Sequence, residues 1–171
     1  GQSFGETQLI EMSNGNIMIV GRGYGSPYNG TITILDQQGN IIKNATSIGK
    51  FYESPQLIEM SNGNIMIVGY DSFYGFITIL NQQGDILKEA TSIGQYFAAP
   101  QLIEMSNENI MIVGYGSSTG YIFICEPIMT NGKITLNEIN VDTTLKKDKY
   151  YELVYNETQN KFIAEEVRNA N

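Results

Sequence analysis

The chain has 171 residues, 42% of them hydrophobic, which is enough to form a buried core. Its formal net charge of −8 argues against a nucleic-acid partner, because binding to a phosphate backbone needs a basic face. It contains no histidine and one cysteine, which excludes histidine-based triads, histidine-ligated zinc and an internal disulfide.

The dominant feature of the sequence is an internal repeat. The segment QLIEMSNGNIMIVG occurs at residues 8–21 and 56–69, and it returns at 101–114 with Glu108 in place of glycine. A repeat of about 45 residues is typical of propellers and other arrays. It predicts three units, residues 1–48, 49–93 and 94–141, followed by a linker and a C-terminal segment at residues 142–171.

Each unit is predicted to form four β-strands. In the first unit, residues 8–12 and 16–20 flank Ser13-Asn14-Gly15, where the Asn-Gly pair predicts a type I′ hairpin turn. Residues 31–35 alternate Thr and Ile, as a half-buried strand does, and residues 41–47 follow the turn DQQGN. The segment NIMIV at 16–20 is continuously apolar, which indicates a strand covered on both faces. The units are therefore expected to pack face to face.

Two substitutions in the third unit bear on whether the units are equivalent. Glu108 stands where the other units have a glycine with positive φ, so the turn is expected either to keep its shape at a cost of about 1 kcal/mol or to change type. Cys125 aligns with Leu35 and Leu80 of the other units, so it is expected to be a small buried apolar side chain.

LIEMSNGNIMIVG followed by FITILNQQGDIL resembles the blades of bacterial and phage repeat β-propellers. The resemblance covers roughly residues 1–141 and implies an all-β fold of propeller blades. The sequence lacks the paired glycines of kelch repeats and the tryptophan of WD and sialidase-type repeats. The alternative fold is a β-trefoil, which also consists of three four-stranded units.

Three blades are fewer than the about 4–8 that close a propeller ring, so we expect the units to belong to a larger ring. Residues 1–7 align without gaps with residues 49–55 and 94–100, which favours an excerpt from a longer array. Two copies of the chain forming a six-blade ring is the other solution, so a homo-oligomer is also expected.

A different pattern follows the repeats. Residues 142–149 form a polar connector, and residues 150–155 and 162–167 are predicted to form a β-hairpin. The segment KYYELVYNETQNKFIAEE resembles hairpins near the ends of phage tail-fibre and other virion appendage proteins. The resemblance implies a virion or extracellular location. A hairpin here is also suited to covering the open edge of the last unit.

The connections between the second and third strands differ in every unit, at residues 22–30, 70–75 and 115–120. They are rich in Tyr, Ser, Gly and Asn, a composition that gives binding loops rigid aromatic area and adaptable hydrogen bonding. The alternative is ordinary turn chemistry with tyrosine rings packed on blade edges. The predicted ligand-binding residues are Tyr24, Tyr28, Tyr70, Asp71, Phe73, Tyr74, Tyr115 and Ser117.

A glutamate recurs at one position of the first strand, as Glu11, Glu59 and Glu104. In a propeller this strand lines the central channel, so we interpret these residues as solvated channel side chains. A ring of carboxylates that holds a cation is the less favoured interpretation.

The sequence therefore favours a non-enzymatic binding module that recognises a surface glycan or protein receptor and contacts other appendage subunits. A purely structural or oligomerisation module is the alternative. A polysaccharide-cleaving enzyme is less favoured, because the spacing of Glu11, Glu59 and Asp71 singles out no acid and base. We expect no metal, no cofactor and no membrane insertion, since no apolar run approaches the about 18 residues that span a bilayer.

Overall fold

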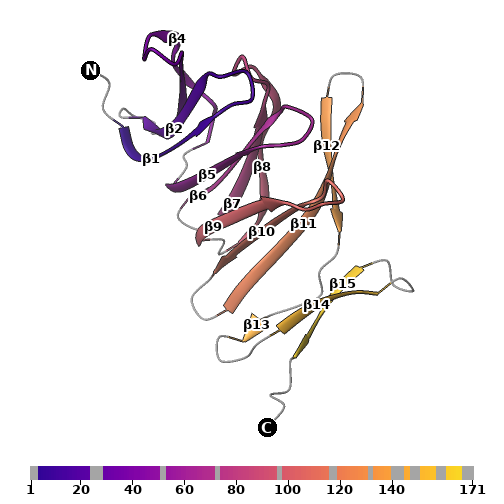
Figure 1. Ribbon diagram of the computed structural model, residues 1–171. Coiled ribbons are helices and arrows are strands. Elements are labelled where there is room, and N and C mark those ends of the chain that lie inside the picture. Colours follow the sequence, from indigo (N-terminus) through magenta and orange to yellow (C-terminus); the bar gives the residue numbers. More distant parts are fainter. Residues whose placement is uncertain are drawn as a thin grey trace.

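The computed structural model shows an all-β chain, as the sequence predicts (Figure 1). It describes residues 4–23, 29–50, 53–71, 74–95, 98–115, 119–130, 133–139, 145–146, 151–156 and 161–166. Within these ranges every regular element is a β-strand.

Each repeat unit forms one antiparallel sheet whose strands are paired in chain order. The first sheet consists of β1 (Phe4–Glu11), β2 (Ile17–Gly23), β3 (Gly30–Leu35) and β4 (Ile41–Ser47). The second consists of β5 (Glu53–Glu59), β6 (Ile65–Asp71), β7 (Tyr74–Leu80) and β8 (Ile86–Gln95). The third consists of β9 (Ala98–Glu104), β10 (Ile110–Tyr115), β11 (Thr119–Thr130) and β12 (Lys133–Ile139).

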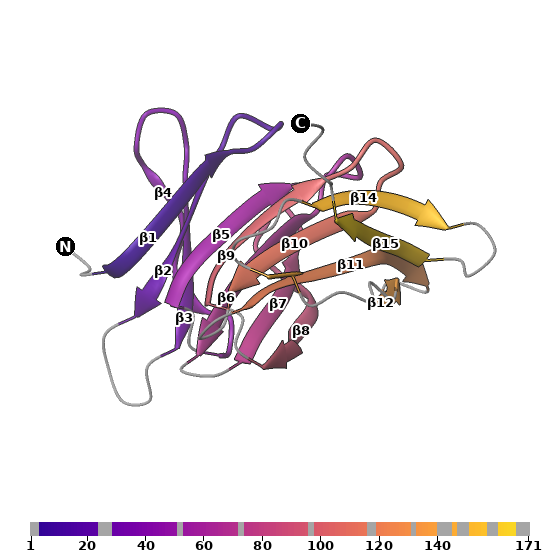
Figure 2. The same cartoon turned by 90° about the horizontal axis from the view of Figure 1, so that it is seen from below.

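The C-terminal segment adds three shorter strands. Strand β13 (Leu145–Lys146) pairs with β11, and β14 (Tyr151–Asn156) pairs with β15 (Lys161–Glu166) in a separate sheet. The hairpin predicted from the sequence is therefore present. Figures 1 and 2 show it on the side of the third sheet that faces away from the second.

The three sheets stack side by side in chain order. No described strand of one unit pairs with a strand of another unit. This differs from a β-trefoil, whose barrel is formed by strands of all three units. The first strands β1, β5 and β9 lie next to one another, whereas β4 and β8 lie farther apart (Figure 2).

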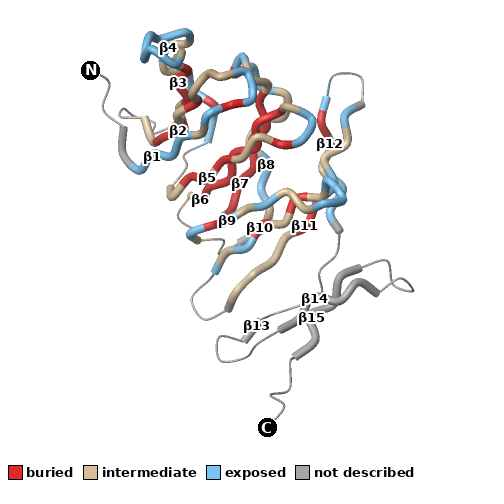
Figure 3. The backbone as a smooth tube through the Cα atoms, in the orientation of Figure 1, coloured by how far each residue is buried: buried red, intermediate tan, exposed pale blue. Residues whose placement is uncertain are grey.

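Two hydrophobic clusters fill the spaces between successive sheets (Figure 3). The first cluster includes Ile32 of the first sheet and Ile67 of the second. The other includes Met66 of the second sheet and Ile112 of the third. The expected face-to-face packing of the units is thus observed, and the second sheet is covered on both sides.

Strand β6 is the doubly covered strand that the NIMIV segment predicts. Ile65 and Ile67 belong to the cluster shared with the first sheet, Met66 and Val68 belong to the cluster shared with the third, and all four are 0% exposed. In β2 the alternate isoleucines Ile17 and Ile19 are only half-buried. The prediction therefore holds in full only for the middle unit, because one face of β2 has no neighbouring sheet among the described residues.

The turn between the first two strands has one geometry in all three units, but it is not the expected type I′ turn. In each unit the last turn residue donates its N–H to a methionine carbonyl, from Gly15 to Met12 (2.8 Å), Gly63 to Met60 (2.8 Å) and Glu108 to Met105 (2.9 Å). The φ angle is positive at Gly15 (83°), Gly63 (79°) and Glu108 (65°), but not at the asparagine before each. A type I turn followed by a left-handed residue and a bulge has this pattern. Of the two outcomes expected for Glu108, the structure shows the first: the third turn keeps the shape of the other two, with a positive φ at Glu108.

These turns also connect neighbouring sheets. Ser13 donates from its backbone N and its Oγ to the two carboxylate oxygens of Glu59 in β5 (2.6 and 2.7 Å). Ser61 donates in the same way to Glu104 in β9 (2.7 and 2.8 Å). We call this pair of hydrogen bonds the Ser–Glu contact. The interpretation as solvated channel side chains is wrong for Glu59 and Glu104, because each of these two glutamates binds the turn of the preceding unit. Glu11, in the first unit, is exposed.

A second contact joins the turn before β8 to strands β3 and β4 of the first sheet. Gly84, in the turn between β7 and β8, is buried with a φ of 75°, and a Cβ there would lie 2.6 Å from Cδ1 of Ile32. Beside it, Lys43 of β4 donates to the carbonyl oxygen of Gln83 (2.9 Å) and forms an ion pair with Asp85 (3.1 Å). The turn of one unit therefore packs closely on the strands of the unit before it.

Replacing Gly84 by Ala should destabilise the protein in two ways. Positive φ costs a residue with a Cβ about 1 kcal/mol, and the overlap with Ile32 adds roughly 1–3 kcal/mol. Because Ile32→Val removes the overlapping methyl group, the Gly84→Ala penalty should be smaller in the Ile32→Val background by about 1 kcal/mol. Urea unfolding of the four proteins of this double-mutant cycle measures the difference. Additive penalties would contradict the packing of this turn on the first sheet.

A second prediction concerns acid stability. Burial opposes the charge of Glu59, but hydrogen bonds from Ser13 and Gln82 outweigh it and hold the pKa of this carboxyl below its usual value. The resulting stabilisation is present above the usual carboxyl pKa and is lost as the pH falls through the lowered one. Glu59→Gln should therefore cost about 1 kcal/mol at pH 7, and less at pH 3.

Urea unfolding at the two pH values measures this change in the free energy of unfolding. Glu89→Gln, which alters an exposed carboxylate on β8, is the matched control and should have little effect at either pH. A Glu59→Gln penalty of equal size at both pH values would show that the charge of Glu59 does not hold the sheets together.

Candidate functional site

The alternation of strand direction places the variable segments of all three units at one end of the molecule. We call it the loop end; it comprises the connections between second and third strands (23–30, 71–74 and 115–119) and those between units (47–53 and 95–98). The opposite end, the turn end, carries the repeated hairpin turns at residues 12–16, 60–64 and 105–109. Constant and variable parts of the repeat are thus separated by the length of a strand.

Four of the eight predicted binding residues lie within the described part of the chain, and all four are at the loop end. Tyr74 is 39% exposed and Tyr115 is 58% exposed. Tyr70 and Asp71 are half-buried. The other predicted residues lie outside the described residues: Tyr24, Tyr28, Phe73 and Ser117. Two tyrosine rings from different sheets are therefore open to solvent at this end.

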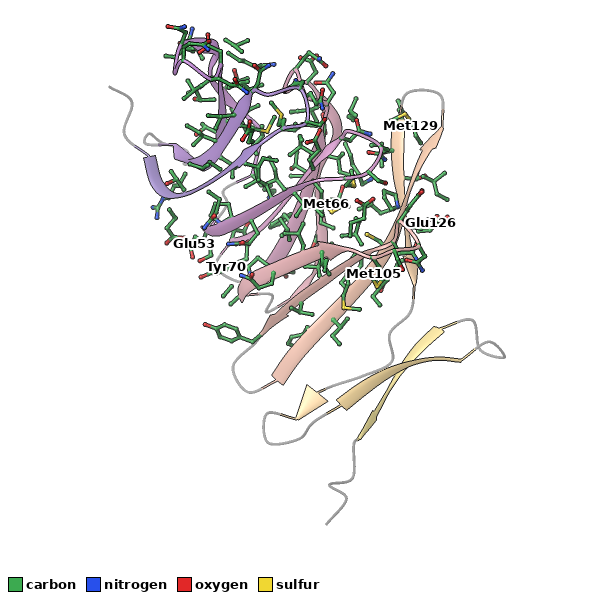
Figure 4. The ribbon with its side chains drawn as sticks, in the orientation of Figure 1. Glu53, Met66, Tyr70, Met105, Glu126 and Met129 are labelled. Atoms are coloured by element: carbon green, nitrogen blue, oxygen red, sulfur yellow. The ribbon has the colours of Figure 1, made fainter. Side chains whose placement is uncertain are left out.

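Tyr70 is held by polar side chains from two units. It shares hydrogen bonds with Glu53 and Ser54, and the carboxylates of Glu53 and Glu6 lie close enough to influence its ionisation. Glu6, on β1 of the first sheet, accepts hydrogen bonds from the backbone N–H and the Oγ of Ser54 on β5. Figure 4 shows Glu53 and Tyr70 close together. We call Glu6, Glu53, Ser54 and Tyr70 the Tyr70 cluster.

The electrostatics of the Tyr70 cluster keep the tyrosine neutral. Burial, and after it the negative charge of Glu53, raises the pKa of the Tyr70 hydroxyl. The hydroxyl is therefore protonated at neutral pH and acts as a donor, while carboxylates accept.

A strained backbone position recurs at the loop end of every unit. The φ angle is positive at Glu6 (37°), Ser54 (42°) and Ala99 (42°), which occupy the same place in their units. The register between first and second strands shifts at or next to each of these residues. Non-glycine residues rarely adopt positive φ, and bulges of this kind redirect a side chain. In the first two units the redirected residues, Glu6 and Ser54, bind each other.

The sequence analysis did not identify Glu6, Glu53 and Ser54 as site residues. A signal was present, because the connections between units also differ from one another. The aligned position reads Glu6, Ser54 and Ala99 in the three units, although the strand that follows is constant. Antiparallel pairing brings these variable positions to the same end as the tyrosine loops.

Two features away from the loop end carry no site. A cavity of about 230 Å³ at the turn end is lined by Asn14, Ile42 and Gln82, among others, and is smaller than a typical ligand pocket. Cys125 is fully buried, and burial, followed by the charge of Glu138, raises its pKa to about 12. Its thiol is therefore unreactive, which confirms the prediction of a small buried side chain. Among the described residues, no group of His, Cys, Asp and Glu could hold a metal ion.

No protein-family model matches the sequence, and a search of curated proteins finds no match. The described residues include no helix that is long and apolar enough to cross a membrane. The function is therefore inferred from the chemistry and geometry of the loop end.

The raised pKa of Tyr70 predicts an effect at alkaline pH. Because the hydroxyl ionises less readily in the folded protein, its stabilisation is present below the usual tyrosine pKa of about 10 and is lost as the pH rises through the folded one. Tyr70→Phe should cost about 1 kcal/mol at pH 8, and the gap to the wild type should narrow at pH 10.5. Urea unfolding measures both values, with the exposed Tyr115→Phe as control. A gap that widens with pH would contradict the hydrogen bonding of Tyr70.

Proposed function

We propose that this chain is a non-enzymatic binding module of a virion or extracellular appendage, which recognises a surface glycan or a protein receptor through its loop end. In this proposal the three sheets are successive blades of a β-propeller. Other subunits of the appendage are its structural partners. The virion or extracellular location follows from the resemblance of residues 149–166 to tail-fibre hairpins.

The stacking of the sheets supports the propeller. The innermost strands β1, β5 and β9 lie next to one another. Of the outer strands, β4 and β8 are farther apart, whereas β8 and β12 are in contact. Blades that radiate from a central axis have this arrangement. The hydrophobic clusters on both faces of the second sheet are also what a blade between two others requires.

The observation that carries the binding role is the contrast between the two ends. At the turn end, the turn geometry and the Ser–Glu contact are repeated from unit to unit. At the loop end the units differ, and Tyr74 and Tyr115 are exposed there. A constant scaffold with variable aromatic loops is the design of binding proteins, in which tyrosine provides contact area with little loss of conformational entropy.

Two other roles are an enzyme that cleaves glycosides, which fits this geometry less well, and a purely structural module. Glycoside cleavage needs two carboxyl groups about 5–10 Å apart, and Asp71 at the loop end is a strand length away from Glu11 and Glu59 at the turn end. Glu59 is in addition bound to Ser13. A purely structural role is the second candidate, and it is favoured by exposed apolar side chains such as Leu9 (62%) and Ile103 (60%) on the outer sheets.

A binding assay on the purified chain tests the proposal. Glycan arrays and intact host cells are the probes, and Tyr74→Ser combined with Tyr115→Ser is the variant. Both rings are exposed, so the double substitution should leave the fold intact. We expect the affinity to fall at least tenfold, since aromatic contacts dominate such surfaces.

The matched control is Ile41→Ser combined with Ile86→Ser, which removes two exposed apolar side chains next to the turns that precede β4 and β8. This variant should bind as the wild type does. Absence of binding to every glycan and cell surface, or equal loss in both double variants, would reject the loop end as the binding surface and favour the structural role.

A further inference from the structure

The interface between successive units is built twice with the same chemistry. The Ser–Glu contact joins the first sheet to the second through Ser13 and Glu59, and the second to the third through Ser61 and Glu104. Apolar side chains of the same repeat positions fill the space beside it in both cases. One surface of the repeat unit is therefore complementary to the opposite surface of the same unit.

The outward face of the first sheet corresponds to the face of the second sheet that carries Glu59 and packs on the first sheet. Leu9 is 62% exposed there, whereas the equivalent Leu57 is 7% exposed against the first sheet. A Cβ on Gly39 would meet nothing within 4 Å, whereas one on the equivalent Gly84 would overlap Ile32. The first sheet thus has the same shape as the second on this side but nothing described against it.

Two polar groups complete this face. Glu11 occupies the position of Glu59 and is exposed, and among the described residues it accepts one long hydrogen bond, from Gln37 of its own unit (3.4 Å). The Oγ1 of Thr33, which is 6% exposed, has no hydrogen-bond partner among the described residues. Thr33 alternates along β3 with Ile32 and Ile34, which pack toward the second sheet, so it lies on the outward face.

The outward face of the third sheet corresponds to the other half of this interface. Val113 is 37% exposed, whereas the equivalent Val20 and Val68 are 0% exposed beneath the next sheet. Ile103 is 60% exposed, and Ser106, at the position of Ser13 and Ser61, is also exposed. Hairpin β14–β15 lies on this side of the sheet in Figures 1 and 2. Ile124 faces the same side, because it alternates along β11 with Cys125, and it is 0% exposed, whereas Val113 and Ile103 are open to solvent.

We propose that a second copy of this chain docks head to tail on these faces, with the first sheet of one copy against the third sheet of the other. Ser106 of one copy donates from its backbone N–H and Oγ to Glu11 of the next, as Ser13 does to Glu59 within the chain. Leu9 is then covered as Leu57 is. The contact is heterologous, so successive copies add in one direction and close into a ring if the rotation between them permits.

The charges at this junction are compatible with docking. Within the chain, Lys43 of the first sheet meets Asp85 in the next turn. In the third sheet, Ile139 occupies the position that Lys43 has in the first sheet. Ile139 pairs with Ile124 just as Lys43 pairs with Ile34. In the first sheet, the turn position of Asp85 is occupied by Asn40. Both charges of the ion pair are therefore replaced together, so this position places no lone charge in the junction.

The test uses Leu9→Glu and Ile103→Glu in the full chain, because each puts a charge on one outward face at an exposed position. Sedimentation velocity at about 1–100 μM protein measures the mass. We expect the wild type to associate and each variant alone to sediment as one chain. A mixture of the two variants should form dimers, since the third sheet of Leu9→Glu and the first sheet of Ile103→Glu are unaltered.

Two milder variants refine the test. Glu11→Gln should weaken the association of the otherwise wild-type chain roughly tenfold, by analogy with the loss of a charged hydrogen-bond acceptor. Ile86→Glu, at an exposed isoleucine on the second sheet, is the control and should associate like the wild type. Unchanged thermal unfolding of each variant at low concentration shows that the fold is retained.

Several results would overturn the proposal. A wild type that remains a single chain at 100 μM excludes docking by a second copy. Association that survives Ile103→Glu but not Leu9→Glu indicates a face-to-face dimer through the first sheet alone. If the full chain is a single species and associates only after removal of residues 142–171, then the C-terminal segment of the same chain occupies the face. The assay contains no ligand, so its failure is distinct from that of the binding role.

Discussion

The structure depends on one constraint, which is that a four-stranded sheet with two apolar faces is stable only between neighbours. Ile65, Met66, Ile67 and Val68 alternate between the two faces of β6, and all are fully buried because a sheet lies on each side. An isolated unit would expose all four of these side chains, each of which contributes roughly 1.5–3 kcal/mol when buried. Stability in such an array comes from the interfaces as much as from the units.

The polar contacts between units fix the register of this stack. A type I turn with its left-handed residue orients the N–H and Oγ of Ser13 toward Glu59, and the same turn in the second unit orients Ser61 toward Glu104. Apolar packing alone does not specify how one sheet slides over another, whereas these hydrogen bonds are directional. The turn has the same geometry in the third unit, where Glu108 adopts a φ of 65°.

Much of the fold follows from the sequence because the repeat fixes the phase of every strand. The four strands of each unit, the doubly covered segment in the second unit, the C-terminal hairpin and the burial of Cys125 were all predictable. The turn type was not, because an Asn-Gly pair suits both the type I′ turn and the observed turn, in which only Gly15 is left-handed. The Ser–Glu contact was not predicted, because a glutamate that recurs in each unit gives the same sequence pattern whether its side chain faces water or binds the preceding unit. The Tyr70 cluster depends on the bulges at Glu6 and Ser54, which no spacing in the sequence reveals.

The three copies of NIMIV, at residues 16–20, 64–68 and 109–113, allow the constraint to be measured directly. Their intrinsic hydrogen-exchange rates are nearly equal, so differences in protection report the surroundings of each copy. Native-state hydrogen exchange in dilute solution should show residues 65–68 protected at least tenfold more than residues 17–20 and 110–113. Equal protection of the three copies would contradict the dependence of each sheet on its neighbours.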